Sequence, residues 1–264
     1  MTERHPPRFF VPPTDEDGAP LEAGRRLALP PTEAHHAAHV LRLRPGDAVE
    51  MFDGRGRTAD GLIDEVRRDG VTVRVEAVHP RAAPAAPAIR LAFAVPKGKR
   101  LDWLLEKATE LGAARLAPVR FARSVAGREA LSPAARRRWS ARCIAAAKQA
   151  RRPDLPTIEP VRALADALPP DGAGVFGDTG AAARPVADVL AAMPPPPGVR
   201  SLHIYVGPEG GLADAERAAL AAAGVAGVRL GPAVLRIETA AVALLAAAVA
   251  WRDEAAAGDM AGKW

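Results

Sequence analysis

The sequence predicts an α/β protein in which a mostly parallel sheet follows a smaller, strand-rich N-terminal part. Three observations support this: short β-type segments dominate about the first eighty residues, strands alternate with helices after residue 89, and a Pro/Ala-rich stretch lies between. A chain of 264 residues exceeds one average domain and can bury a core without disulfides or metals. We therefore expect an N-terminal domain over residues 1–80, a linker over 81–88 and an α/β domain over 89–264.

The N-terminal part reads as a small β-barrel. Residues 48–52 and 61–63 are short apolar segments separated by a Gly/Asp turn, and residues 71–75 alternate apolar with polar side chains. Small barrels of this kind often bind nucleic acids, so a nucleic-acid-binding role is expected by analogy. The stretch 79–87, rich in proline and alanine, is typical of a linker.

The second part alternates strands and helices. In the segment 100–111, leucines and alanines recur at helical spacing, and Gly112 stands at the C-terminal cap position. The same patterns predict strands over 89–95, 116–119, 201–206 and 225–230, and helices over 136–150, 214–223 and 238–251. This alternation predicts a mostly parallel sheet.

The charge balance favours a polyanionic partner. The net charge is +5 and the isoelectric point is near 10.0, with arginine on most of the basic side. Nucleic acid is the simplest such partner, although a biased codon supply would enrich Arg, Ala, Gly and Pro regardless of function. The basic run 136–138 is read as a solvated helix face rather than an RNA contact.

Several features point to a cytoplasmic protein. The one cysteine, Cys143, cannot form an internal disulfide, which fits a reducing compartment. The N-terminus lacks a secretory pattern, and the apolar run 240–251 is shorter than the roughly twenty residues of a membrane span. His35, His36 and His39 lack the accompanying ligands of a zinc site, so no metal is expected.

Two loops carry the chemistry. The first, GPEGG at 207–211, follows an apolar strand and precedes a helix, so a ligand there would meet backbone N–H groups at a helix start. The second, LGPAVLRIETA at 230–240, occupies the same kind of junction, and open α/β sheets bind ligands at such strand ends. Arg236 and Glu238 are either functional or a simple salt bridge. Neither loop fits a dinucleotide or NTP motif.

These two strings resemble the cofactor loops of SPOUT methyltransferases, and more narrowly those of the bacterial 16S rRNA uridine-N3 methyltransferase family, RsmE. Ordered matches continue through most of the chain, including residues 36–47, 52–54, 96–98, 102–103, 107, 110–112, 124, 139, 149 and 152. The resemblance implies a PUA-like RNA-binding barrel, a knotted α/β domain with a trefoil knot, S-adenosyl-L-methionine (SAM) as cofactor, a homodimer, and 16S rRNA of the small subunit as substrate.

The resemblance also assigns residues. Cofactor binding falls to Gly207, Pro208, Glu209, Gly210, Gly211, Leu230, Gly231, Leu235, Arg236 and Thr239. RNA binding falls to Arg42, Arg44, Lys97, Arg123, Ser124, Gln149 and Arg152.

Methylation of uridine N3 needs a proton acceptor near N3 and positive charge near O2 or O4, because the nitrogen lone pair is available only after its proton leaves. Arg236 is our candidate for the charge. Glu209 or Glu238 either accepts the proton or orients Arg236.

The chain departs from the family pattern at Ala233, Ile237 and Ala213. The last removes a helix-capping side chain, although Glu216 stands where a capping-box acid would help. Two rival interpretations therefore stay open: a SPOUT enzyme of other specificity, such as a ribose 2′-O-methyltransferase, and an inactive rRNA-binding assembly factor. Trp103 and Trp139 are predicted to be core residues.

Overall fold

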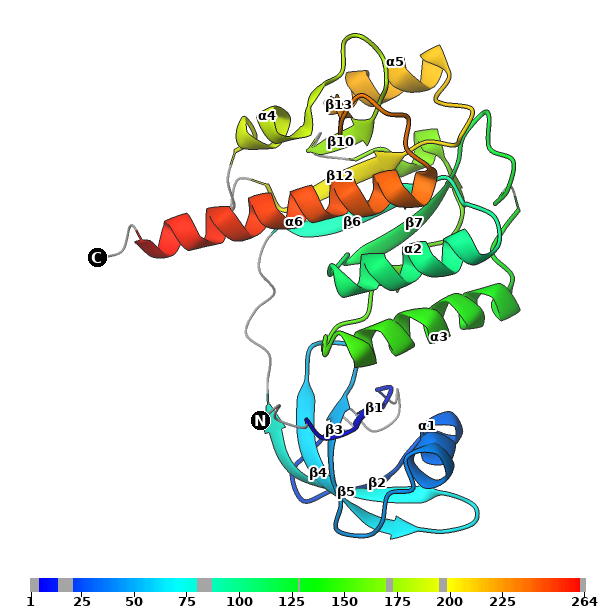
Figure 1. Ribbon diagram of the computed structural model, residues 1–264, viewed down its shortest axis with the longest axis vertical. Helices are drawn as coiled ribbons and strands as arrows, with labels where there is room; N and C mark the ends of the chain where they lie inside the picture. The colour runs from blue at the N-terminus through cyan, green and yellow to red at the C-terminus, as the bar shows by residue number, and fades with distance from the viewer. Residues whose placement is uncertain are drawn as a thin grey trace. The chain divides into compact units, whose positions relative to one another are not determined.

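The computed structural model describes residues 5–13, 21–79, 87–127, 129–169, 173–194 and 199–261. They form two compact units (Figure 1): unit 1 comprises residues 1–83 and 147–155, and unit 2 comprises residues 84–146 and 156–264. Residues 81–86 of the predicted linker lie outside the described residues. Nothing in the periodicity indicated that residues 147–155 would join the first unit.

Unit 1 contains a curled five-stranded sheet with the order β1-β3-β4-β5-β2. Its strands are β1 (Arg8–Phe10), β2 (Arg26–Ala28), β3 (Ala48–Phe52), β4 (Thr58–Val66) and β5 (Val71–His79). β1 runs parallel to β3, and the other pairs are antiparallel. Two register shifts between β4 and β5 mark bulges, which bend a sheet. The predicted barrel-like N-terminal part is confirmed.

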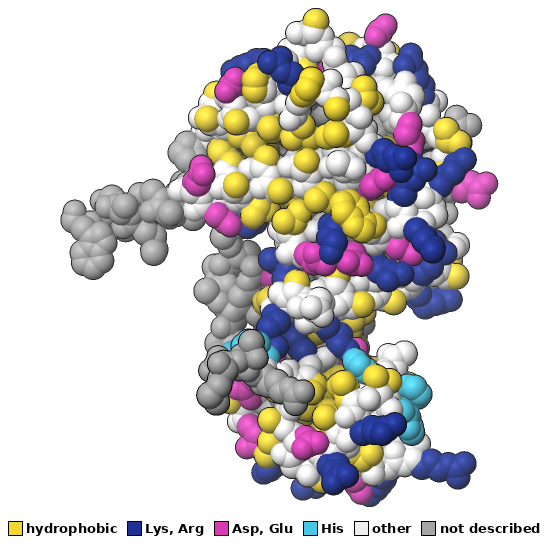
Figure 2. Space-filling view, in the orientation of Figure 1, with side chains coloured by type: hydrophobic (Ala, Val, Ile, Leu, Met, Phe, Trp, Pro, Cys, Tyr) yellow, Lys and Arg dark blue, Asp and Glu magenta, His cyan; other side chains and the backbone are white. Residues whose placement is uncertain are grey.

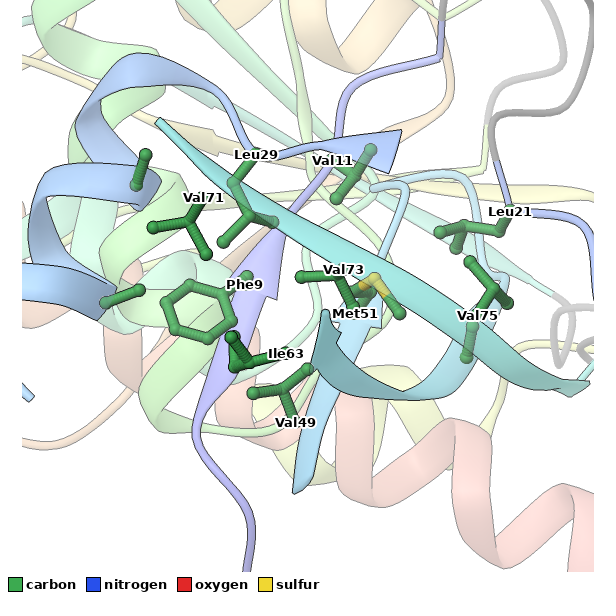
Figure 3. Packing of buried hydrophobic residues seen from close by; sticks show 13 residues of the cluster. Phe9, Val11, Leu21, Leu29, Val49, Met51, Ile63, Val71, Val73 and Val75 are labelled. Carbon is green, nitrogen blue, oxygen red and sulfur yellow. The ribbon is translucent and has the colours of Figure 1, made fainter. Parts of the chain in front are cut away.

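The core of unit 1 lies on the concave side of this sheet (Figure 3). Phe9, Met51, Ile63 and Val73 come from four different strands and are at most 1 % exposed. Over residues 71–75 of β5 every second residue is buried, which is the alternation that predicted the strand. Helix α1 (Pro31–His35) and the π-helix at His36–Val40 each add an alanine to the same core.

Residues 147–155 are fastened to unit 1 by backbone and side-chain bonds. The amide of Leu155 donates to the carbonyl of Gly54 at 2.9 Å. Lys148 Nζ donates to Glu33 Oε2 at 2.6 Å, with both side chains largely buried. Because these partners lie far away in sequence, local patterns could not indicate them.

Unit 2 contains a parallel sheet with the order β11-β13-β10-β12-β6-β7-β8, and β9 pairs with β7. The strands are β6 (Ala88–Phe93), β7 (Arg115–Arg120), β8 (Thr157–Ile158), β9 (Arg162–Ala163), β10 (Gly174–Gly177), β11 (Arg184–Pro185), β12 (Ser201–Val206) and β13 (Val225–Arg229). The predicted α/β class with a mostly parallel sheet is confirmed. The buried strand β10, between β12 and β13, was not predicted.

Helices cover this sheet (Figure 1). They are α2 (Lys99–Glu110), α3 (Pro133–Gln149), α4 (Val186–Ala191), α5 (Asp214–Ala222) and α6 (Ile237–Ala261), with a short 3₁₀ turn at Leu164–Ala167. α6 lies along β12, β6 and α2 and is longer than predicted. Within the described residues, none of the helices combines the length and apolar character that a membrane crossing requires.

Helix α2 largely follows the structure that its leucine spacing and Gly112 predict. Leu101, Leu104 and Leu105 are buried as predicted. Gly112 has φ +82°, the left-handed conformation that ends helices. The predicted burial of Trp139 is confirmed at 2 % exposure, but the prediction for Trp103 is wrong, because its side chain is 41 % exposed on α2.

Candidate functional site

A cleft lies at the carboxyl ends of three adjacent strands of unit 2, β13, β10 and β12. It holds about 820 Å³ of empty space and opens to solvent. Its walls come from residues 177–179 at the end of β10, 206–209 and 211–212 at and after the end of β12, and 228, 230–231 and 233–235 at and after the end of β13. Helix α6 closes one side with Ile237 and Ala240. We call it the main cleft. Both glycine-containing loops selected from the sequence meet here.

Most of the predicted cofactor residues line the main cleft. Seven do so: Gly207, Pro208, Glu209, Gly211, Leu230, Gly231 and Leu235. Gly210 is not among the lining residues. A Cβ built on it would lie 3.3 Å from the side chain of Arg123. Arg236 and Thr239 also lie off the wall. The α6 residues that do line it are three positions apart, so Thr239 falls on another side of the helix.

Two glycines keep the backbone open to the main cleft. A Cβ built on Gly231 would meet no atom within 4 Å, so a side chain there would occupy open space beside the wall. Gly211 has φ +72°, a conformation that other residues adopt only with strain. Both positions leave the main chain of these loops free of a side chain at the cleft wall.

A third loop, after β10, was missed by the sequence analysis. Asp178 and Thr179 line the main cleft. Asp178 Oδ1 accepts a hydrogen bond from Arg217 Nε at 3.2 Å, and the Asp178 amide donates to the carbonyl of Val228 at 2.8 Å. Arg217 Nη1 also donates to the carbonyl of Leu212 at 2.7 Å. These bonds tie all three loops together.

Helix α5 begins beside the first loop, and only one of the two hydrogen bonds of a capping box is present there. Ala213 has no side chain to cap the helix, but its amide donates to Glu216 Oε2 at 2.7 Å, as predicted. Glu216 Oε1 also accepts from the amide of Ala122 at 2.7 Å. One carboxylate thus links the start of α5 to the loop after β7.

A second cleft adjoins the first. It holds about 600 Å³ of empty space, and the two share Pro208, Glu209 and Ile237 as a common wall. We call it the side cleft. Its other walls follow the carboxyl ends of β6 and β7, and they are residues 94–95, 97, 100 and 124–126.

The side cleft is basic on one wall. Lys97 and Ser124, both predicted RNA contacts, line it together with Arg100. Arg100 Nη1 lies 3.4 Å from Oε1 of Glu209, and both side chains are about half exposed. Arg123, a third predicted RNA contact, donates from Nη1 to the carbonyl of Gly210 at 2.8 Å. Cationic groups and one carboxylate therefore surround the boundary between the clefts.

The other two catalytic candidates, Arg236 and Glu238, flank Ile237 of the shared wall but are not lining residues themselves. Arg236 is exposed and, in the part of the chain that the structure describes, forms no ion pair with Glu238. Glu238 is 8 % exposed at the start of α6, and its Oε2 has no hydrogen-bond partner among the described residues. Neither residue lines the main or the side cleft.

The remaining predicted RNA contacts belong to unit 1. Arg42 and Arg44 are exposed, and Arg42 has φ +55°, which is uncommon outside glycine. Gln149 and Arg152 lie in the segment that joins unit 1, the first exposed and the second half-buried. Among the described residues, His, Cys, Asp and Glu side chains form no group of three suited to a metal ion.

Family models match both units. The RNA methyltransferase domain matches residues 84–249, and the RNA methyltransferase PUA domain matches residues 29–76. The chain belongs to the RNA methyltransferase family. The resemblance noted in the sequence is thereby confirmed, and the methyltransferase domain contains every wall of both clefts.

Curated relatives of this RNA methyltransferase carry one name. Ribosomal RNA small subunit methyltransferase E of Mycobacterium tuberculosis (strain CDC 1551 / Oshkosh) is 37 % identical over 222 residues, covering 81 % of this chain and 82 % of the relative. The protein of the same name from Bacillus subtilis (strain 168) is 28 % identical over 257 residues, covering 96 % and 99 %.

Solved structures agree in fold over nearly the whole length. A protein from Legionella pneumophila with bound SAM superposes with a TM-score of 0.80 at 26 % identity, covering 93 % of this chain and 98 % of that one. Ribosomal RNA small subunit methyltransferase E from Neisseria gonorrhoeae, bound to SAM, gives 0.77 at 28 % identity, covering 92 % and 96 %. The expectation of SAM-dependent rRNA methylation is confirmed at the level of the family.

Proposed function

We propose that this RNA methyltransferase transfers the methyl group of SAM to N3 of one specific uridine in 16S rRNA of the small ribosomal subunit. The observation that carries the proposal is the junction of the two clefts at Pro208 and Glu209. A cofactor in one cleft and a base in the other would meet at that shared wall. The family name of the relatives supports the substrate class.

The residues of the main cleft fit SAM. Val206, Leu230 and Ile237 offer apolar surface for an adenine ring, and Asp178 and Thr179 offer oxygen acceptors for ribose hydroxyls. The space beside Gly231, which a Cβ would fill, leaves the backbone of the second loop open to the cofactor. When bound, SAM supplies a methyl group that its sulfonium centre already activates.

The side cleft is the proposed seat of the uracil base. Lys97 and Arg100 place positive charge on its wall, where negative charge on O2 or O4 would be stabilised as the N3 proton leaves. Ser124 on the wall of the side cleft is buried, so this part of the wall suits a flat, largely apolar ring. A base that reacts here must leave its stack, as bases do in other enzymes that modify them.

Glu209 is the proposed proton acceptor. The reaction forms a bond from N3 to the methyl carbon and breaks the bond from that carbon to sulfur, so the N3 proton must pass to a base. Glu209 lies on the wall shared by both clefts, while Glu238 is buried and lines neither. Arg100, at 3.4 Å, keeps the Glu209 carboxylate oriented before the base arrives. Arg236 remains a proposed contact to the RNA or its developing charge.

We also propose a homodimer, because α6 has an apolar face that unit 2 does not cover. No charged residue occurs between Thr239 and Arg252. Ala241, Leu244 and Leu245 are buried, yet residues 242–243 between them are half-exposed, and residues 246 and 250 beyond them are exposed. Figure 2 shows hydrophobic side chains gathered along this helix. A helix that is apolar all round normally has a partner on every side, and a second copy would provide it.

The proposal is tested by replacing Glu209 with glutamine. Single-turnover methylation of small subunits purified from a strain lacking the gene should slow roughly a hundredfold or more, because general-base catalysis contributes about that much. SAM affinity should change little. Glu106→Gln is the matched control, since Glu106 is half-exposed on α2 and lines neither cleft. An unchanged rate in Glu209→Gln would remove Glu209 from the mechanism.

A further inference from the structure

A third hollow lies at the opposite edge of the unit 2 sheet from both clefts. Its walls are the amino ends of β6, β7, β8 and β12 together with the 3₁₀ turn, and it holds about 1330 Å³ of solvent-open space. β6 and β12 each have six residues, so at roughly 3.3 Å per residue about 20 Å of strand separates it from the clefts. We call it the amino-edge pocket.

The floor of the amino-edge pocket is a buried ion pair. Arg90 donates from Nε to Glu159 Oε1 at 2.9 Å and from Nη2 to Oε2 at 2.8 Å. Its third nitrogen, Nη1, donates to the carbonyl of Ala167 at 3.1 Å. Hydrogen bonds from Arg90 hold the pKa of Glu159 below its usual value despite burial. The floor is therefore rigid, and its two charges cancel.

The rim carries three further arginines, of which Arg115 and Arg162 lie close enough to Glu159 to help lower its pKa. Arg115, 60 % exposed, approaches Glu159 only to 3.9 Å. Arg136 donates from Nη1 to the carbonyl of Ile158 at 2.6 Å, a bond that fixes the side chain without neutralising it. Arg162 is exposed and has no ion-pair partner in the part of the chain that the structure describes.

Because Arg90 and Glu159 balance each other, the three rim arginines and one further carboxylate, that of Asp166, leave the lining with a net charge of +2. Guanidinium groups bind phosphate oxygens through paired N–H donors, and an open hollow admits a group that is part of a chain. The same arginines could bind a small carboxylate ligand, but such a ligand carries less negative charge than a nucleic acid backbone. The net charge of the whole protein, +5, has the same sign.

We infer that the amino-edge pocket binds a backbone phosphate of the RNA substrate, at a second contact remote from the methyl-transfer site. The inference rests on the proposed action on RNA. It adds a position that fixes the register of the RNA without reading its sequence, as phosphate contacts do. None of the RNA contacts expected from the sequence lies in this pocket.

The test removes two of the three rim arginines and keeps both residues of the floor ion pair. The variant is Arg115→Ala/Arg162→Ala, and the matched control is Arg137→Ala/Arg184→Ala, two exposed arginines of unit 2 outside every pocket described above. The probe is 16S rRNA transcribed in vitro, titrated at several salt concentrations. Removing two arginine contacts to the phosphate should weaken rRNA binding roughly tenfold or more. It should also reduce the slope of log affinity against log salt concentration by about one to two. SAM affinity should be unchanged, and Arg115→Lys/Arg162→Lys should recover most of the salt slope.

Three results would overturn the inference. The first is a salt slope in the alanine variant equal to that of the wild type, and the second is an equal loss in the control. The third is millimolar binding of inorganic phosphate that Arg115→Ala/Arg162→Ala abolishes while rRNA affinity stays intact, which would make the pocket a free-phosphate site. Failure of the proposed function would look different, because wild-type protein would then leave purified small subunits unmethylated whatever the rim residues do.

Discussion

Replacing Gly231 with valine tests whether SAM binds in the main cleft. Gly231 lines the main cleft, has no atom within 4 Å of an added Cβ and needs no left-handed backbone. The folded protein should therefore accept valine with a change in stability within about 0.5 kcal/mol. The new side chain must then share space with SAM. Overpacking of this size costs about 1–3 kcal/mol, which weakens binding roughly 5- to 150-fold.

The assay is isothermal titration of SAM into each variant, with melting temperature as the check on folding. Gly70→Val is the matched control, since Gly70 also has no atom within 4 Å of an added Cβ and no left-handed backbone but belongs to unit 1. We expect the control to bind SAM like the wild type. A SAM affinity for Gly231→Val within twofold of the control would refute the placement of SAM in the main cleft.

Three further predictions concern single residues. Arg236→Ala should lower single-turnover methylation roughly a hundredfold with little change in melting temperature or SAM affinity, because no ion pair holds it to Glu238 among the described residues; a normal rate would remove Arg236 from the mechanism. Glu159→Gln should destabilise the fold by about 3–5 kcal/mol near neutral pH, since it strands a buried Arg90. The lowered pKa of Glu159 means its contribution is present above pH 4.5 and fades as pH falls below that value, so denaturant curves for wild type and variant should converge only in acid. Cys143, 2 % exposed and with its pKa raised by burial to about 11, should react with a thiol reagent only after denaturation; fast labelling of the native protein would contradict its buried placement.

Local patterns were enough to find most of the elements that frame the clefts, with β10 as the exception. β12 and β3 match their predicted bounds, and α2 follows its leucine spacing. The two glycine loops were found because each stands between an apolar strand and a helix, a junction that sequence displays directly. Their convergence at one sheet edge follows from parallel topology, which the alternation of elements already implied.

Local sequence patterns could not show which side chains line the clefts or which distant segments pack together. The third loop was missed because β10 is only four residues long and begins and ends with glycine, although residues 177–180 repeat the glycine-after-strand pattern of the other two loops. The pattern placed Arg236 in the second loop but could not show that it is exposed and lines neither cleft. The attachment of residues 147–155 to unit 1 depends on long-range bonds such as that between Lys148 and Glu33.

One measurement tests the central claim most directly. Small subunits from a strain lacking the gene are incubated with the purified protein and SAM, and the modified nucleotide is mapped by mass spectrometry of rRNA fragments. We predict a single 3-methyluridine in 16S rRNA, absent without SAM and reduced in Glu209→Gln. A methyl group on a ribose 2′-oxygen, or SAM binding without any transfer to the subunit, would contradict the account.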